Sequence, residues 1–368
     1  MESMTLHDDS LDKAVEGLVQ EERHLAAARL LRRRLHTSKQ ISEDHRKLLR
    51  NANVIEHAVA ELLSSPKNDW IKQGESHGKN GDFTIYYKIQ EGAKLTCRIE
   101  SPIPTSHLVP LLSVLNESGL YHEWIPTFHR PFKLGVTSSK QLASFSRGHQ
   151  VIQVQCSVPY PIYPREALFD VVAIDDIDEN GYIIAKMTTV TEGNCSNLPD
   201  IFDFPGVTTG FERCDFDGAV LFRACPTDHA NYESAKRKCH GQDLILTSFS
   251  FHFDARLRYI PQALINFVTR EALGIIWNML LNVAEQVRDG TRTQHCEVIA
   301  QKKEFYEWVE GRCQFMLDKM KSKSDDHHSS GLSQNSNTPE VNASCDKEEC
   351  EEKKDDNWTM QDILRLNT

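Results

Sequence analysis

The sequence predicts an α+β fold in which a meandering antiparallel sheet lies against one long C-terminal helix, with a helical extension at the N-terminus. Three observations lead to this prediction. Apolar residues recur at helical spacing in residues 10–64. From Trp70 onward they alternate with polar residues at a period of two, as in strands. A broad apolar helical face then runs through residues 260–287.

Two helices are predicted in the N-terminal extension, residues 1–64. The apolar positions of the first helix fall on one stripe, and those of the second continue until Pro66 ends the helix. Each stripe needs a partner, so we expect the two helices to pack antiparallel as a hairpin. The two stripes consist of Leu11, Val15, Leu18, Leu25, Ala28, Leu31 and Leu35, and of Leu48, Leu49, Ala52, Ile55, Val59 and Leu62.

Seven stretches rich in β-branched and aromatic residues are predicted strands. Short turns join several of them, which is typical of an antiparallel meander. A helical insert, residues 107–128, interrupts the series once. The seven stretches are DFTIYYKI, AKLTCRIE, VIQVQCSV, ALFDVVAI, GYIIAKMTTV, AVLFRACP and DLILTSFSFHF.

The long apolar helix spans about 40 Å at ~1.5 Å per residue, so it must lie against the sheet. Sheet and helix together define a main domain at 65–289. A further helix is expected within 290–322. Residues 323–368 are acidic and polar, and we expect this tail to be disordered. Near its end, WTMQDILRL is either a docking segment for a protein partner or an unpacked terminus.

Charge and composition exclude several classes of protein. The chain has 368 residues and a formal net charge of -11, which argues against nucleic acid as a partner. No apolar run approaches the ~20 residues of a membrane span, and the acidic N-terminus does not resemble a secretory signal. Ten cysteines occur without a C-x-x-C pair, which fits reduced thiols. We therefore expect a soluble cytoplasmic protein.

The segment GESHG, residues 74–78, fits the G-x-S-x-G pattern of hydrolases with a nucleophilic serine. That serine needs a strand before it and a helix after it. Here a predicted strand follows, and the density of Gly, Ser, Asn and Asp is typical of a hairpin loop. We expect Ser76 to lie in a turn and to have no catalytic role.

The segment DIDENG, residues 176–181, matches the first half of an EF-hand calcium loop. The twelfth position should be a glutamate but is Met187, and the flanks are predicted strands. A tight turn explains these residues without calcium. The densest Cys/His group, between Cys214 and His240, lacks the paired spacing of zinc ligands. We expect neither a metal nor a cofactor.

Three segments resemble a known family. They are YHEWIPTF at the end of the helical insert, PYPIYPREALFD before a strand, and RLRYIPQALINFVTREALGIIWNML at the entry to the last helix. Their order and spacing are similar to those of the START family of lipid-transfer domains, over residues 65–289. The resemblance implies a helix-grip fold, in which a curved antiparallel sheet is closed around a lipid cavity by the C-terminal helix.

The resemblance also implies a function without catalysis. A START-like domain binds a single membrane lipid, which is a phospholipid, a sphingolipid or a sterol, and transfers or senses it. Where phosphatidylcholine carriers have an arginine, this sequence has Tyr121, and where sterol carriers have a buried arginine it has Val171. The identity of the lipid therefore does not carry over from the family.

Ten residues are the predicted lipid-binding set. For several of them an alternative stays open. Arg165 lines the cavity or forms a structural ion pair. Arg98 lines it only if Cys97 and Ile99 face solvent, and Gln153 faces a head group or water. The set is Arg98, Tyr121, Trp124, Phe128, Gln153, Arg165, Val171, Ala263, Phe267 and Ile275.

Lipid exchange requires a transient contact with a membrane surface. Phe202, Phe204 and Val207 lie in a loop rich in Gly, Pro and Asn, and we expect them to dip into that surface. The protein would then be transiently peripheral to membranes. Two rival functions remain: an adaptor in which the cavity is vestigial, and an enzyme that uses the cavity.

Overall fold

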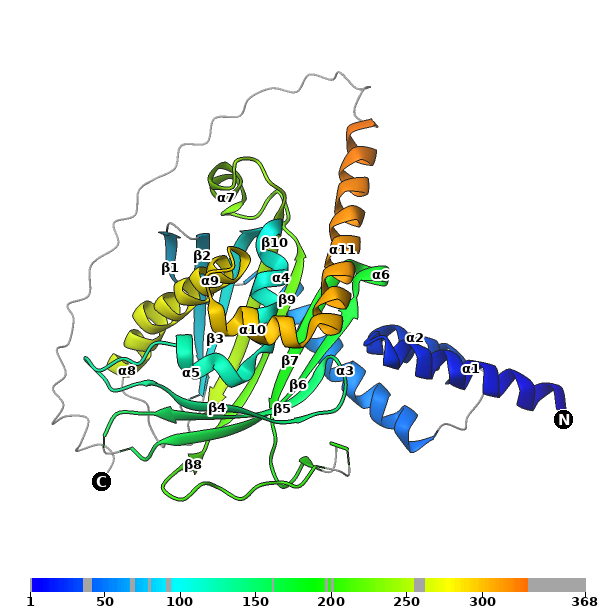
Figure 1. The fold of residues 1–368 in the computed structure, drawn as a ribbon, viewed down its shortest axis with the longest axis horizontal. Helices are drawn as coiled ribbons and strands as arrows, with labels where there is room; N and C mark the ends of the chain where they lie inside the picture. The colour runs from blue at the N-terminus through cyan, green and yellow to red at the C-terminus, as the bar shows by residue number, and fades with distance from the viewer. Residues whose placement is uncertain are drawn as a thin grey trace.

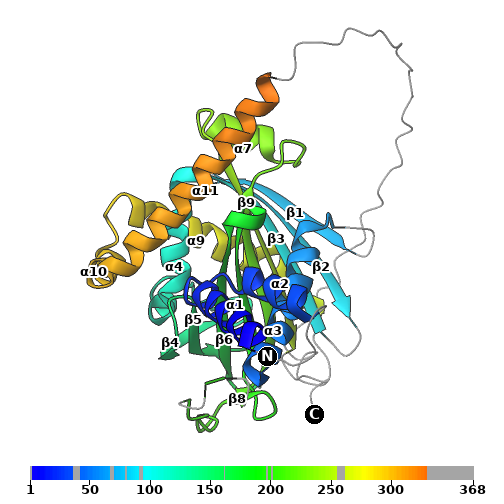
Figure 2. The ribbon, with the colours of Figure 1, turned by 90° about the vertical axis from the view of Figure 1, so that its right-hand side faces the viewer.

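A computed structural model describes residues 2–35, 42–66, 70–78, 81–90, 94–160, 162–195, 198–199, 202–254 and 262–329. Its centre is a curved antiparallel sheet with the strand order β1-β2-β3-β10-β9-β7-β6-β5-β4, and β8 pairs with β6. The closing helices lie on one face of this sheet, here called the inner face, and the N-terminal helices lie on the opposite, outer face (Figure 1, Figure 2). This arrangement confirms the predicted α+β helix-grip fold.

All seven predicted strand stretches form strands. The sequence prediction missed three: the edge strands β1 and β4, and the short β8. Segment GESHG lies inside β1, so the hairpin turn comes after Ser76 and not around it. The strands are β1 Ile71–Gly78, β2 Gly81–Gln90, β3 Lys94–Pro104, β4 Gly135–Ser144, β5 His149–Ser157, β6 Arg165–Asp176, β7 Tyr182–Thr189, β8 Glu212–Arg213, β9 Asp215–Ala224 and β10 Leu244–Asp254.

Three helices, not two, form the N-terminal extension: α1 Glu2–Gln20, α2 His24–Leu35 and α3 Glu43–Leu63. The predicted first helix is divided because the chain turns at Glu22, which has a positive φ of 61°. Apolar residues of α2 and α3 pack on the outer face of β6, β7 and β9. This layer contains Leu25, Ile55, Val59, Ile174, Tyr182, Ile184 and Leu221.

The closing helix begins with α8 Gln262–Phe267, continues through a π-helical turn at Val268–Ala272, and ends with α9 Leu273–Arg288. By length and composition Ala263–Arg288 could cross a membrane, contrary to our expectation from apolar run length. In the structure its apolar side packs on the inner face of the sheet. The buried residues of α9 are Leu273, Trp277, Leu280, Leu281, Val283 and Ala284.

The helices of the insert fall within the predicted range 107–128, and α4 lies beside α9. The remaining helices connect strands or follow α9. Helix α11 continues beyond the predicted end at residue 322, and the segment 358–366 falls outside the described residues. These elements are the 3-10 turns Thr105–His107 and Ser118–Leu120, α4 Leu108–Asn116, α5 Tyr121–Trp124, α6 Ile177–Asn180, α7 Tyr232–Lys238, α10 Thr293–Gln301 and α11 Lys303–Ser329.

Candidate functional site

A cavity of about 330 Å³ lies between the inner face of the sheet and the closing helix. This volume falls within the range of ~300–1,000 Å³ typical of small-molecule sites. Alternate residues of each strand point into it, because successive side chains of a strand face opposite sides of a sheet. The strands contribute Leu95, Val154, Cys156, Ala167, Phe169, Phe216, Phe251 and Phe253, and the closing helix contributes Leu264, Ile265, Val268, Leu273 and Ile276.

Aromatic rings form a continuous wall on the sheet side. The ring of Phe216 stacks on Phe251, with centroids 5.5 Å apart and an interplanar angle of 13°. Phe169 meets Phe216 edge-on at 5.2 Å. Gly218 makes room for this wall, since a Cβ atom at that position would lie 2.8 Å from the Phe216 ring. The wall is therefore built to present hydrocarbon surface.

Arg165 is the one charged side chain among the described residues that line the cavity. Its guanidinium is buried and already engaged. It donates a hydrogen bond of 2.7 Å to the main-chain oxygen of Tyr163 and pairs with Glu212 at 2.7 Å. The structure thus shows the ion pair that we considered for Arg165, placed at the cavity wall.

The described lining of the cavity is apolar apart from Arg165 and two thiols. The described lining residues include no His, Asp, Glu, Lys, Ser or Tyr side chain. Two thiols are present, Cys156 and Cys214. Burial raises the pKa of Cys156 to about 12, so this thiol stays protonated and weakly nucleophilic at neutral pH.

Phe128, like Arg165, lines the cavity. Phe267 stands directly behind it, with the two rings 5.3 Å apart at 90°. Ala263 packs in the same small cluster with Phe267 and Phe132, outside the cavity lining. From the closing helix, α8 contributes Leu264 and Ile265 to the cavity lining in place of Ala263 and Phe267.

The other predicted residues of the insert and the helix lie elsewhere. Trp124 is a core tryptophan. The Tyr121 hydroxyl donates to the main-chain oxygen of Leu115 at 2.5 Å, and burial raises its pKa. Ile275 is 44% exposed and lies outside the cavity lining. Its neighbour Ile276 lines the cavity instead.

Arg98 does not reach the cavity, so this prediction was wrong. Cys97 and Ile99 are buried in the inner core, which turns Arg98 to the outer face. There its side chain is 1% exposed. It donates to the main-chain oxygens of Glu61 and Leu62 and pairs with Glu100 at 2.5 Å. Arg98 thus joins the end of α3 to the back of the sheet.

Gln153 also lies on the outer face. Its amide donates to Glu166 at 2.8 Å, beside a second bond from Gln155 to the same carboxylate. The residues that face the cavity from this strand are Val154 and Cys156. The prediction failed because alternation separates the two faces of a strand without telling which one is inner.

Val171 lines a second, smaller cavity of about 130 Å³. This cavity lies under α11, between Leu112 and Leu115 of α4 and Phe222 of β9. Along β6, the inward residues Ala167 and Phe169 face the larger cavity and Val171 faces the smaller one. No arginine occupies the position of Val171, but Arg147 and Arg312 border the same space.

The predicted membrane residues are mostly covered. Phe202 and Phe204 are half-buried and pack on Val151 and Leu168 of the outer face. Arg213 lies over the Phe204 ring at 5.7 Å. Val207 remains 51% exposed. The two phenylalanines therefore fasten their loop to the sheet, contrary to our expectation that they are exposed.

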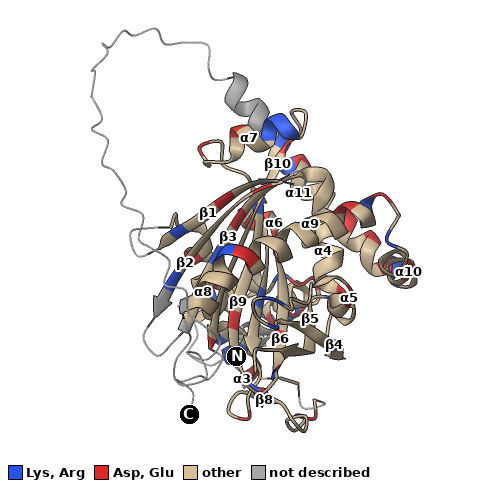
Figure 3. Ribbon diagram, turned by 90° about the vertical axis from the view of Figure 1, so that its left-hand side faces the viewer, with Lys and Arg blue, Asp and Glu red and all other residues tan. Residues whose placement is uncertain are grey.

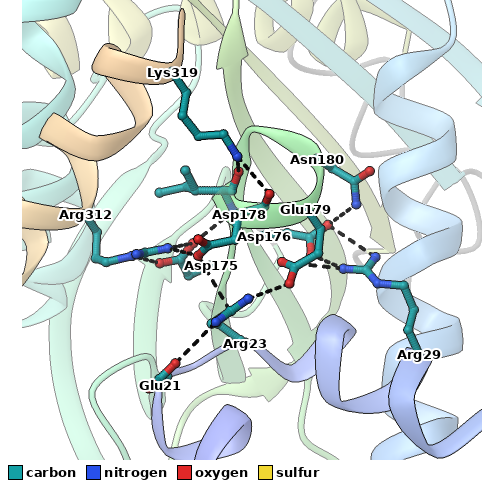
Figure 4. Close-up of polar contacts among 11 residues, drawn as sticks. Glu21, Arg23, Arg29, Asp175, Asp176, Asp178, Glu179, Asn180, Arg312 and Lys319 are labelled. Carbon is teal, nitrogen blue, oxygen red and sulfur yellow. Dashed lines mark hydrogen bonds and ion pairs between the residues drawn. The ribbon is translucent and has the colours of Figure 1, made fainter.

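The DIDENG segment connects β6 to β7 through the single turn of α6, with Gly181 at a φ of 74°. Figure 4 shows its carboxylates facing basic residues from two helices. Arg312 of α11 pairs with Asp175 and Asp178, and Arg29 of α2 pairs with Asp176. These carboxylates are engaged by arginine, and the described residues contain no group of three His, Cys, Asp or Glu side chains suited to a metal ion.

Comparison with known proteins yields likenesses of fold. No family model matches the sequence, and no curated protein matches it. Human StAR-related lipid transfer protein 5 is 16% identical, with 64% of this chain and 97% of that chain covered and a TM-score of 0.44. Human STARD10 is 11% identical, with coverage of 74% and 89% and a TM-score of 0.45. A STAR-related lipid transfer protein fragment from Xanthomonas axonopodis is 16% identical, with coverage of 59% and 99% and a TM-score of 0.40.

Proposed function

We propose that the protein binds one membrane lipid in the larger cavity and transfers or senses it, without catalysis. The observation that carries this proposal is the composition of the cavity wall, which is aliphatic and aromatic apart from Arg165 and two thiols. Burial of hydrocarbon contributes about 0.8 kcal/mol per CH₂ group. A ligand rich in polar groups would lose its hydrogen bonds to water and find few replacements.

The ligand class is a phospholipid, a sphingolipid or a sterol. Arg165 is committed to Tyr163 and Glu212, so it supports the wall and does not select a head group by a free charge. We propose that the cavity selects its lipid by shape and apolar contact, through rings such as Phe169 and Phe251. The free thiols of the described residues fit a reducing compartment, and we propose a cytoplasmic protein that visits membranes transiently.

Tyr160 and Tyr163 are the proposed membrane contact, with Val207. These two tyrosines are 79% and 63% exposed. They lie on the β5–β6 loop, whose Val158, Pro159 and Ile162 line the cavity. Tyrosine is enriched at membrane interfaces, where its ring contacts lipid and its hydroxyl contacts water. This loop therefore places interfacial side chains beside the lipid site.

Native mass spectrometry of the purified full-length protein, followed by solvent extraction, tests the proposal. We expect one lipid per chain, drawn from a single class. If the protein carries no lipid and takes none from mixed liposomes, the cavity is vestigial and the adaptor function replaces this one. Turnover of a bound ester with release of its acid would instead support an enzyme.

A further inference from the structure

Two loops border the same end of the larger cavity. One loop precedes β4 and the other follows β5, and the strands pair with Gly135 opposite Ser157, so the loops are neighbours. Phe128 and Leu134, from the first loop, face the cavity, as do Val158 and Ile162 from the second. We call this end of the cavity its mouth.

The first loop carries exposed basic residues. Phe128 and Leu134 are joined by a β-bridge, and the chain between them, residues 129–133, is exposed except at Phe132. Arg130 and Lys133 are exposed, with His129 beside them. Within the part of the chain that the structure describes, neither Arg130 nor Lys133 has an ion pair or a side-chain hydrogen bond. Residues 129–133 are here called the basic loop.

The basic loop contrasts with the chain as a whole, which is negatively charged. The formal net charge is -11, so an anionic surface repels most approaches of the protein. Exposed cationic side chains at the mouth favour orientations in which the lipid site faces that surface. Exposed tyrosines on the neighbouring loop supply the apolar contact that a membrane requires.

We propose that the basic loop docks the mouth on a membrane surface that contains anionic lipids. This inference rests on the proposed lipid-binding function and specifies the membrane it meets. Arg130 and Lys133 contact anionic head groups, while the adjacent tyrosines enter the interface. Each basic residue near such a surface contributes about 1 kcal/mol, and salt screens that contribution.

The basic loop is also joined to the closing helix. Phe132, inside the loop, is buried, and its ring lies 5.7 Å from the ring of Phe267 on α8. Phe128, at the base of the loop, also contacts the Phe267 ring, at 5.3 Å between centroids. A π-helical turn follows α8, and such turns often mark functional sites in helices. The basic loop is therefore in direct contact with the helix that covers the cavity.

A second basic group, on α7, provides a natural control (Figure 3). Helix α7 joins β9 to β10 at the opposite end of the sheet from the mouth. There Lys236 pairs with Asp243, and Lys238 pairs with Asp82. Arg237 is exposed and has no such pair within the described residues. It matches Arg130 in residue type and exposure but lies far from the cavity.

Co-sedimentation of the full-length protein with vesicles tests the inference. One set of vesicles is phosphatidylcholine alone and the other adds phosphatidylserine, each at low and high salt. We expect binding to the phosphatidylserine vesicles that high salt abolishes. Arg130→Gln and Lys133→Gln should each weaken it about fivefold, and the double variant about twentyfold. Arg237→Gln should change it by less than about twofold.

Equal binding to both vesicles, or unchanged binding of the double variant, would overturn the inference. Native mass spectrometry of the same samples distinguishes failure of the docking inference from failure of the proposed lipid-binding function. If the wild type carries lipid but ignores anionic vesicles, only the docking inference fails. If the wild type carries no lipid under any condition, the proposed lipid-binding function is wrong, and the docking inference that rests on it is wrong as well.

Discussion

The guanidinium of Arg98, on the outer face of β3, donates a hydrogen bond of 2.8 Å to the main-chain oxygen of Leu62 in the last turn of α3. A second bond, of 2.9 Å, reaches the main-chain oxygen of Glu61. The last carbonyls of a helix have no partner within the helix, so Arg98 supplies a donor to the Leu62 oxygen, and its charge complements the helix dipole. The Glu61 oxygen also accepts hydrogen bonds from Ser64, which caps the helix. The N-terminal helices are thereby tied to the sheet behind the cavity.

Replacement of Arg98 by alanine should lower the free energy of unfolding by about 3 kcal/mol or more, because it leaves the buried Glu100 without its arginine partner. Urea unfolding of the full-length protein measures this loss. The matched control is Arg50→Ala on α3, whose pair with Glu43 is exposed to solvent and should contribute little to stability. Equal losses in the two variants would contradict this account of Arg98.

Strand positions were predictable here because alternation and β-branched residues identify them directly, as in Gly81–Gln90. Strands that lack this alternation could not be predicted from the sequence. Ile71–Gly78 contains two glycines and only one large apolar residue, and it forms a strand because it pairs with β2 along its length. That pairing depends on tertiary structure, which local sequence does not report.

Individual cavity residues were harder to predict than the fold. A period of two says that Arg98 and Ile99 face opposite sides, but both sides of this sheet are covered by helices. A strand face that is exposed to solvent usually carries polar residues. Because helices cover both faces here, that pattern does not distinguish the inner face from the outer face. Arg98 carries a charge yet is buried, and Ile275 is apolar yet exposed. The structure was therefore needed to assign which residues line the cavity.

His295 on α10 should make stability depend on pH. Its side chain is fully buried, and burial together with the nearby Arg292 lowers its pKa below the ordinary value. The unfolded chain therefore binds a proton at this histidine more readily than the folded chain does. The free energy of unfolding is therefore highest above about pH 6.5, and it decreases as the pH falls below that value. His295→Phe should reduce the difference in unfolding free energy between about pH 8 and about pH 5.5.

Exposed His57 on α3 is the control for that measurement. His57→Phe should leave the same pH difference unchanged. An undiminished pH difference in His295→Phe would show that another group is responsible.

Arg312 should hold α11 against the sheet. It pairs with Asp175, which is buried, and with Asp178 on the β6–β7 connector (Figure 4). Arg312→Ala leaves the Asp175 carboxylate without this partner, so we expect faster amide hydrogen exchange throughout α11. Lys303→Ala, which breaks an exposed pair with Glu307 on the same helix, should not change that exchange. Equal exchange in the two variants would contradict this role.

Tyr160 and Tyr163 should contribute to membrane binding through their exposed rings. The double variant Tyr160→Ser/Tyr163→Ser should bind vesicles about tenfold less tightly, since two interfacial side chains lose their contact with lipid. Vesicle co-sedimentation gives the affinity. Val54→Ser, at a similarly exposed apolar residue on α3, serves as the comparison and should bind normally. Weaker binding in both would point to a general effect of surface hydrophobicity.

The most direct test of lipid binding in the larger cavity compares two adjacent residues of α9. Ile276 lines the cavity, and Ile275 lies outside the cavity lining and is exposed. Tryptophan at either position adds the same volume, but only at Ile276 does it occupy the space proposed for the lipid. Native mass spectrometry should show roughly tenfold less bound lipid in Ile276→Trp and wild-type occupancy in Ile275→Trp. Full occupancy in Ile276→Trp would show that the lipid does not lie in this cavity.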